Sequence, residues 1–102
     1  MAFKEARTQL IEALRSGSYQ HEAREAQEEK NLLAIGDIQP EEVIEILKAC
    51  RGTGYKSDTH HTVRSITVHV FKGKKVIRNH REWYVKAYFL GEDAWFISVH
   101  PA

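Results

Sequence analysis

Residues 83–100 run Trp-Tyr-Val-Lys-Ala-Tyr-Phe-Leu-Gly-Glu-Asp-Ala-Trp-Phe-Ile-Ser-Val-His, with apolar and polar side chains alternating on both sides of Gly91. This alternation indicates two β-strands joined by a tight turn. With a three-residue loop at residues 91–93, Tyr84 lies opposite His100 on the neighbouring strand. The stretch therefore predicts an antiparallel hairpin with a Tyr–His pair on one face.

A second hairpin is predicted immediately upstream. Residues 64–72 alternate in the same way, and a two-residue turn at Gly73-Lys74 connects them to the next strand. This register sets His69 opposite Arg78. The two hairpins together have an apolar face and a polar face. The apolar face carries Ile66, Val68, Val70, Ile77, Trp83, Val85, Ala87, Phe89, Trp95, Ile97 and Val99, and the polar face carries His69, Arg78, His80, Tyr84, Lys86, Tyr88, Ser98 and His100.

The first half of the chain predicts helices. Apolar residues recur every three or four positions over residues 3–14, which places them on one helical face, and residues 16–18 end that pattern. Residues 21–33 are rich in helix formers but have few apolar anchors, so they predict a solvated helix. A third helix begins at Pro40 and ends near Gly52. Its buried face is expected to carry Val43, Ile46, Leu47 and Cys50.

Together these elements predict an α+β fold. Residues 53–62 are expected to form a polar loop between the helical half and the strands. Two to three N-terminal helices then pack on one face of a C-terminal antiparallel sheet with the strand order of a meander. At 102 residues the chain has the size of one domain, so residues 1–102 are expected to form a single domain.

Composition narrows the kinds of protein this can be. Hydrophobic residues make up 42% of the chain and charged residues 28%, which is typical of a soluble folded protein. No apolar run approaches the length of a membrane span, and residues 1–7 lack the apolar stretch of a signal peptide. The single cysteine, Cys50, rules out an internal disulfide. We expect a cytoplasmic protein with no membrane partner.

The net charge of +1 hides a difference between the two halves of the chain. Residues 1–52 hold seven Lys/Arg against ten Asp/Glu, a balance of −3, whereas residues 53–102 hold eight against four, a balance of +4. Five of the six histidines also lie in the basic half. An anionic partner such as nucleic acid is therefore expected on the strands.

The polar face of the predicted sheet has the side chains that metal-free RNA cleavage requires. Such a reaction removes a proton from the 2′-hydroxyl, stabilises charge on phosphorus and protonates the leaving oxygen. Tyr84 and His100 can move the protons, and Lys86, one pair along, can stabilise the charge. The histidine spacing matches no metal-ligand motif, since His60 and His61 are adjacent and point apart on an extended chain. No metal or other cofactor is expected. A metal-dependent hydrolase that uses His60 and His61 with a third histidine is the weaker alternative.

Basic and aromatic side chains of the second half are candidates for holding RNA. Lys and Arg neutralise phosphates, and aromatic rings stack on unpaired bases. Tyr88 or Phe96 is the expected stacking ring. A solvated hairpin tip remains the alternative explanation for the lysines. The expected RNA-binding residues are Arg64, Lys72, Lys74, Lys75, Arg78, Arg81 and Tyr88.

Several short motifs resemble the RelE/ParE-like clan of small bacterial toxins. Tyr55-Lys56-Ser57, Tyr84-Val85-Lys86 and the strand from Ile97 to His100 are similar to motifs of the MqsR-type messenger-RNA interferases. An uncharacterised domain family of the same clan is a second resemblance, and the choice between the two branches stays open. The motifs similar to that second family are residues 10–17, His21-Glu22-Ala23-Arg24 and Ile38-Gln39-Pro40-Glu41-Glu42-Val43.

The resemblance implies a RelE-like fold and a type II toxin, an endoribonuclease that cleaves messenger RNA, free or on the ribosome, and binds a cognate antitoxin protein. It also implies functional roles for Lys56 and Tyr84. At position 100, where the interferases have a catalytic lysine, this chain has a histidine that can serve as acid or base; residues 64–68 contain no counterpart of the family's glutamine. The alternative is a binding module on the same scaffold, which holds nucleic acid or protein without catalysis. The expected catalytic set is Lys56, Tyr84, Lys86 and His100.

Overall fold

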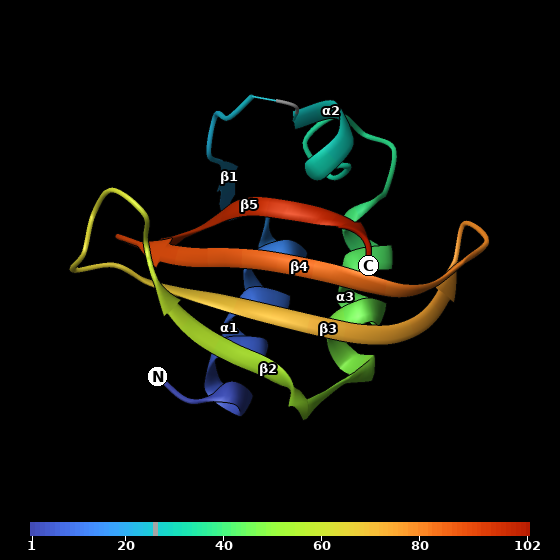
Figure 1. The fold of residues 1–102 in the computed structure, drawn as a ribbon, viewed down its shortest axis with the longest axis horizontal. Helices are drawn as coiled ribbons and strands as arrows, with labels where there is room; N and C mark the ends of the chain where they lie inside the picture. The colour runs from blue at the N-terminus through green and yellow to red at the C-terminus, as the bar shows by residue number, and fades with distance from the viewer. Residues whose placement is uncertain (26) are drawn as a thin grey trace.

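A computed structural model describes residues 1–25 and 27–102 (Figure 1). The two longer helices lie behind a curved five-stranded sheet in this view. No helix among the described residues is long and apolar enough to cross a bilayer. The elements in chain order are α1 (Phe3–Ser16), β1 (Tyr19–His21), α2 (Gln27–Lys30), α3 (Pro40–Ala49), β2 (Cys50–Thr59), β3 (Thr67–Ile77), β4 (His80–Leu90) and β5 (Asp93–Pro101).

The sheet has the strand order β1-β5-β4-β3-β2. Strands β3 to β5 form the predicted antiparallel meander, and the α+β fold is confirmed. Strand β2 extends the meander by one antiparallel strand that the sequence did not predict. The sheet is nevertheless mixed, because β1 pairs in parallel with β5 (Figure 1). The expected helix over residues 21–33 is wrong apart from the short α2, while residue 26 lies outside the described residues. Its few apolar side chains do not support a longer helix, and Asn31 instead forms a bridge to Val99.

Helices α1 and α3 bury their apolar faces against the same side of the sheet. Helix α1 ends where predicted, at Gly17, whose φ of 76° suits the left-handed cap. Helix α3 begins beside Gln39, whose backbone N–H donates to the Glu42 carboxylate at 2.9 Å. The predicted buried stripes are confirmed within both helices, whereas Cys50, expected on the stripe of the third helix, is buried as the first residue of β2. The buried helix residues are Ala6, Leu10, Ala13, Leu14, Val43, Ile44, Ile46 and Leu47.

The turn predicted at Gly73-Lys74 is wrong, because Gly73 lies within β3 opposite Trp83. Glycine is needed there for a different reason: a Cβ on Gly73 would lie 2.5 Å from the Ile46 carbonyl oxygen of α3. The actual turn is Arg78-Asn79, whose φ values of 53° and 69° are those of a two-residue hairpin loop. The pairing of His69 with Arg78 is therefore wrong as well, and His69 faces Ala87.

Strand β3 is longer than predicted, and its side chains face the sides of the sheet opposite to those that the sequence predicts. Val68 and Val70 pack in a cluster on the side away from the helices, whereas Phe71 belongs to the core under α1 and α3. His69 lies on the helix side, where it is 3% exposed and bonds the Tyr55 hydroxyl at 2.8 Å. Burial lowers the pKa of His69, which favours a neutral, structural imidazole.

The last hairpin differs from the prediction in two ways, and the two differences cancel in the register of Tyr84 against His100. The loop contains two residues, not three, because Leu90 pairs with Asp93. A bulge then follows at Ile97, so that Phe96 and Val99 both enter the helix-side core. Trp95 and Ile97, expected in that core, lie on the opposite face. The predicted pairing of Tyr84 with His100 is confirmed.

The polar loop predicted at residues 53–62 is also wrong for most of its length, since β2 continues to Thr59. Strand β2 is the outer strand of the sheet and most of its side chains face solvent, so its polar composition suits an edge position. Its pairing with β3 is irregular between Cys50 and Tyr55. The register of β2 against β3 therefore shifts within the first part of β2, while Cys50 still pairs with Gly73.

Candidate functional site

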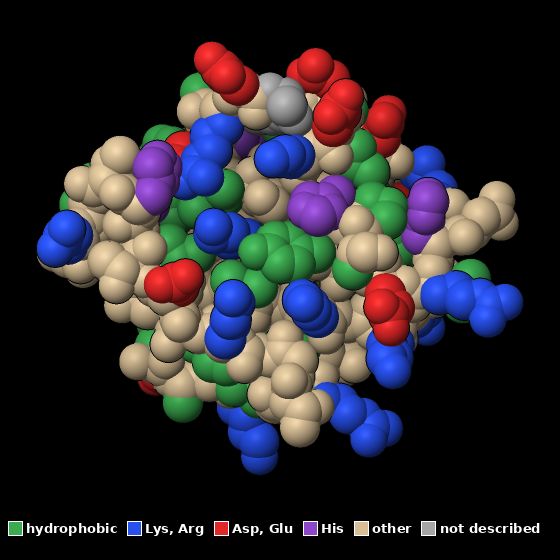
Figure 2. All heavy atoms as spheres, viewed as in Figure 1, with side chains coloured by type: hydrophobic (Ala, Val, Ile, Leu, Met, Phe, Trp, Pro, Cys, Tyr) green, Lys and Arg blue, Asp and Glu red, His purple; other side chains and the backbone are tan. Residues whose placement is uncertain are grey.

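The face of the sheet that α1 and α3 leave uncovered, called the open face below, is turned towards the viewer in Figure 2. Lys, Arg and His side chains gather there around hydrophobic side chains. Its centre is the cluster of Val68, Val70, Tyr88 and Ile97. The open face carries Lys56, Asp58, Val68, Val70, Lys72, Tyr84, Lys86, Tyr88, Trp95, Ile97, Ser98 and His100.

Tyr84 and His100 form the most defined pair on this face. Their strands are hydrogen-bonded neighbours, and the two rings stack with centroids 5.0 Å apart and an interplanar angle of 21°. On its other side Tyr84 pairs with Lys72 of β3. The three residues therefore form one row across three strands, held at the strand spacing of about 4.8 Å.

The hydrogen bonding of this pair favours opposite roles for its two side chains. The His100 ring donates from Nδ1 to the Pro101 carbonyl oxygen at 2.7 Å, which leaves Nε2 as the proton acceptor of the neutral ring. Burial, together with the negative charge of Asp58, raises the pKa of Tyr84. Its hydroxyl stays protonated at neutral pH and can donate. The row thus presents an acceptor and a donor of protons beside an ammonium group.

The next row of the open face supplies two more cations. Lys56 pairs with Val70 of β3, Val70 pairs with Lys86 of β4, and Lys86 pairs with Ser98 of β5. The two lysines therefore lie on either side of a buried valine. All four residues of the expected catalytic set are brought onto one face. The structure adds Lys72, which the sequence assigned to the RNA backbone, next to Tyr84.

The expected stacking rings are not available. Tyr88 is 5% exposed and Phe96 is fully buried, so neither presents a free ring face to a base. Trp95, which the sequence placed in the core, is partly exposed on the open face and stacks on Tyr88 at 6.3 Å and 8°. Alternation alone could not find it, because the bulge that follows changes the face of every earlier residue in β5. Trp95 is the stacking candidate of this structure.

The expected RNA-binding cations are exposed, but the structure does not gather them in one place. Lys74, Lys75 and Arg81 line a hollow near the β3–β4 turn. Arg78 lies in that turn and donates to both Glu42 carboxylate oxygens, at 2.9 and 2.8 Å. Arg64 lies in the β2–β3 loop, at the other end of the sheet. Of the expected RNA-binding cations, Lys72 is the one that belongs to the row with Tyr84 and His100.

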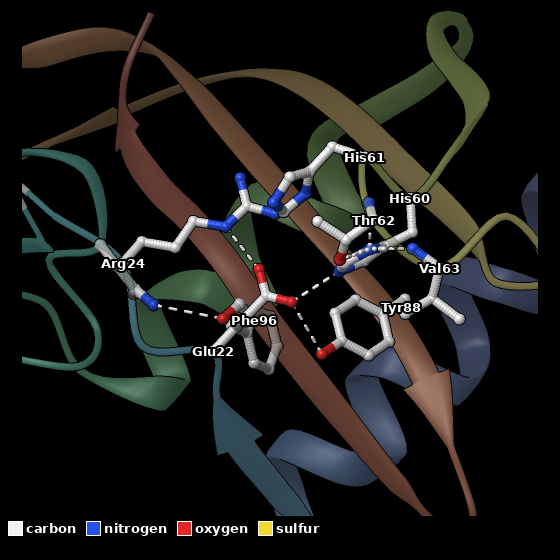
Figure 3. A network of polar contacts seen from close by, with 9 residues as sticks. Glu22, Arg24, His60, His61, Thr62, Val63, Tyr88 and Phe96 are labelled. Carbon is white, nitrogen blue, oxygen red and sulfur yellow. Dashed lines mark hydrogen bonds and ion pairs between the residues drawn. The ribbon is translucent and has the colours of Figure 1, made fainter.

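A polar network closes one end of the open face (Figure 3). The Glu22 carboxylate, which follows β1, accepts hydrogen bonds from Arg24 Nε, from His60 Nε2 at 2.6 Å and from the Tyr88 hydroxyl at 3.1 Å. Burial alone would raise the pKa of Glu22. These hydrogen bonds and the charge of Arg24 outweigh burial and lower that pKa. The network fastens the β2–β3 loop to the edge of the sheet. The sequence singled out Tyr88 for RNA binding and Glu22 and Arg24 only as part of a motif, and it predicted no contact between them.

Glu22, His60 and His61 also have the donor atoms of a metal site, all within 4.8 Å of one another. The His60 ring argues against that use. Its Nδ1 accepts the backbone N–H groups of Thr62 and Val63, each at 3.2 Å, so Nε2 carries the proton and donates to Glu22. A metal ligand needs a free lone pair on Nε2, and its other nitrogen usually donates. Arg24 Nη2, 2.8 Å from His61 Nδ1, adds a positive charge to the same place.

The open face therefore combines a proton acceptor, a proton donor, three ammonium groups and a partly exposed indole on neighbouring strands. No family model, curated protein or solved structure matches the chain. The resemblance to the toxin clan stays an expectation from the motifs themselves.

Proposed function

We propose that the chain is a metal-independent endoribonuclease, a RelE-like toxin that cleaves messenger RNA in the cytoplasm. The observation that carries the proposal is the row Lys72–Tyr84–His100, in which the stacked Tyr–His pair lies beside an ammonium group. The next row adds Lys56 and Lys86. A surface that only had to remain soluble would not need two stacked titratable rings.

The proposed cleavage uses the 2′-hydroxyl of the RNA as nucleophile. His100 Nε2 takes the 2′-hydroxyl proton, and the 2′-oxygen forms a bond to phosphorus. The bond from phosphorus to the 5′-oxygen breaks, and that oxygen receives a proton from the Tyr84 hydroxyl. Lys72, together with the two lysines of the next row, stabilises the charge on the phosphorane oxygens. The products are a 2′,3′-cyclic phosphate and a 5′-hydroxyl end.

The experiment is cleavage of a single-stranded RNA by the purified protein, with the product ends identified by mass spectrometry. We expect cyclic phosphate ends in the presence of EDTA, and a loss of about 10²–10⁴-fold in rate for His100→Ala and for Tyr84→Phe. His80→Ala is the matched control, because His80 is exposed beside the β3–β4 turn and is not part of the row. Cleavage that survives both substitutions, or that requires a metal ion, contradicts the proposal.

As a toxin, the protein would arrest growth on expression and be neutralised by an antitoxin protein that covers the open face. The alternative function is a binding module that uses the same lysines and Trp95 without catalysis. Binding of RNA that remains intact, with equal affinity for the parent and His100→Ala, would favour that alternative.

A further inference from the structure

A groove of about 1080 Å³ lies next to the Lys72–Tyr84–His100 row, at the edge of the sheet formed by β2. It runs between the start of α1, the end of α3 and the irregular first part of β2. Lys72 lines this groove and also pairs with Tyr84 on the open face. The groove and the candidate site are therefore continuous through one lysine.

The walls of the groove are strongly positive. They include five cationic side chains and a single acid, Glu82. Lys74 lies 3.9 Å from this acid, and Lys48 lies 3.9 Å from Glu45. Pairs this exposed hold a side chain only weakly. The cations that line the groove are Arg7, Lys48, Arg51, Lys72 and Lys74.

Arg7 is held in place at the groove wall. Its guanidinium carbon lies 4.6 Å from the centre of the Phe3 ring, and its Nη1 donates to the Cys50 carbonyl oxygen at 2.9 Å. Arg7, Lys48 and Arg51 come from the acidic half of the chain, so the charge difference along the sequence gave no sign of them. The fold brings these cations together with lysines of the basic half.

Three glycines, Gly52, Gly54 and Gly73, line the groove. Gly54 and Gly73 have no room for a Cβ, which would lie 2.5 Å from a backbone carbonyl oxygen in each case. Gly52 differs, because a Cβ there would meet only the Phe3 ring at 3.8 Å and its backbone is not left-handed. The fold does not require glycine at position 52, and a side chain there would occupy space in the groove.

We infer that this groove binds the phosphate backbone of single-stranded RNA on one side of the cleavage site. The inference rests on the proposed function and extends it: the strand crosses the sheet over His100, Tyr84 and Lys72 and then enters the groove. With about 4.8 Å between strands, the path from β5 to β2 is about 14 Å, so the groove holds nucleotides beyond the scissile one. Phosphate contacts of this kind raise affinity without selecting a sequence.

The experiment compares a trinucleotide with a dodecamer RNA for two groove variants. Lys48→Gln/Arg51→Gln removes two exposed cations, and Gly52→Leu fills the groove while keeping every charge. Arg15→Gln/Lys30→Gln is the control, with the same loss of one Lys and one Arg at exposed positions outside the groove. Circular dichroism establishes that each variant is folded.

We expect the double groove variant to bind the dodecamer more weakly and to lower the log–log salt slope by about 1.4, from roughly 0.7 per phosphate contact. Gly52→Leu should weaken dodecamer binding with little change in slope. Both variants should cleave the trinucleotide at the parent rate, and the control should match the parent throughout.

The outcomes separate this inference from the proposed function. Parent-like dodecamer affinity and slope in both groove variants would overturn the groove, whether or not RNA is cleaved. Weaker dodecamer binding in both variants of a parent that cleaves no RNA would support the groove and refute the nuclease. If the parent protein binds no RNA at low salt, both the groove inference and the proposed nuclease are overturned. An acidic protein segment would then be the remaining ligand for the groove.

Discussion

Replacing Glu22 with glutamine tests whether the network at the end of the open face holds the β2–β3 loop in place. The substitution keeps the shape of the side chain and removes its charge. Both His60 and Tyr88 donate to Oε1, which an amide retains, whereas Arg24 donates to Oε2, which becomes an NH₂ group facing another donor. One hydrogen bond is therefore lost and two become neutral.

The expected loss of stability follows from these three bonds. A hydrogen bond to a charged group contributes about 1.5–3 kcal/mol and a neutral one about 0.5–1.5, so each retained bond weakens by roughly 1 kcal/mol. The lost Arg24 bond adds less than its full value, because the Arg24 side chain is 32% exposed. We expect a total of about 2–3 kcal/mol, which lowers the Tm of a domain of this size by roughly 10–20 °C.

The assay is urea and thermal unfolding of the parent and the variant across acidic and neutral pH. The pKa of Glu22 in the folded protein is below its usual value of 4.5. The carboxylate therefore stabilises the folded protein fully above pH 4.5, and this stabilisation is lost as the pH falls through the pKa of the folded protein. The free energies of unfolding of the parent and the variant should differ by the full amount at neutral pH, and this difference should disappear in acid.

Glu45→Gln is the control for this substitution. Glu45 is about half exposed and its partner Lys48 is 3.9 Å away, so its loss should change stability by less than about 0.5 kcal/mol. A Glu22→Gln protein as stable as Glu45→Gln at neutral pH would refute the network. A difference between Glu22→Gln and the parent that persists unchanged in acid would show that the carboxylate charge is not the cause.

Two further predictions concern the turn and the buried phenol. Asn79→Gly should stabilise the protein by about 0.5–1 kcal/mol in urea unfolding, because Asn79 has a φ of 69° and glycine is preferred at the second position of such loops; a less stable variant contradicts this. Burial and the hydrogen bond to Glu22 raise the pKa of Tyr88 from 10 to about 12. The stability from this shift is present below pH 10 and lost as the pH rises through about 12. Titration of tyrosinate absorbance should lose its highest step in Tyr88→Phe, and an unchanged curve would refute the assignment.

The sequence correctly predicted those elements whose residue pattern has a single structural explanation. Helix α1 and helix α3 each have a single apolar stripe, which predicts that this face is buried. The same logic failed for Gly73, since glycine serves both tight turns and close packing. The approach of the α3 backbone at Ile46, which makes glycine necessary, depends on contacts between distant segments. Local pattern cannot distinguish the two uses.

The residue types of the candidate site could be predicted from the sequence, but the hydrogen-bond network around Glu22 could not. Tyr84 and His100 alternate with core residues on adjacent strands, and this alternation predicted their pairing. Glu22, in a segment expected to be a solvated helix, had no such pattern, and its partners His60 and Tyr88 are 38 and 66 residues away. Bonds over such separations follow from the topology of the sheet, which brings β1 beside β5.

The bulge at Ile97 explains why the position of His100 was predicted correctly from an incorrect loop. Ala94 and Phe96 are apolar, and so are Trp95 and Ile97, so alternation fits either set inside the core. With the two-residue turn and no bulge, the register Leu90–Asp93 would bring His100 opposite Trp83, on the helix side. The extra residue restores the register, returns Val99 to the core and turns the His100 ring onto Tyr84. Bulges often redirect side chains next to active sites, and here one bulge decides whether the open face has a proton acceptor at all.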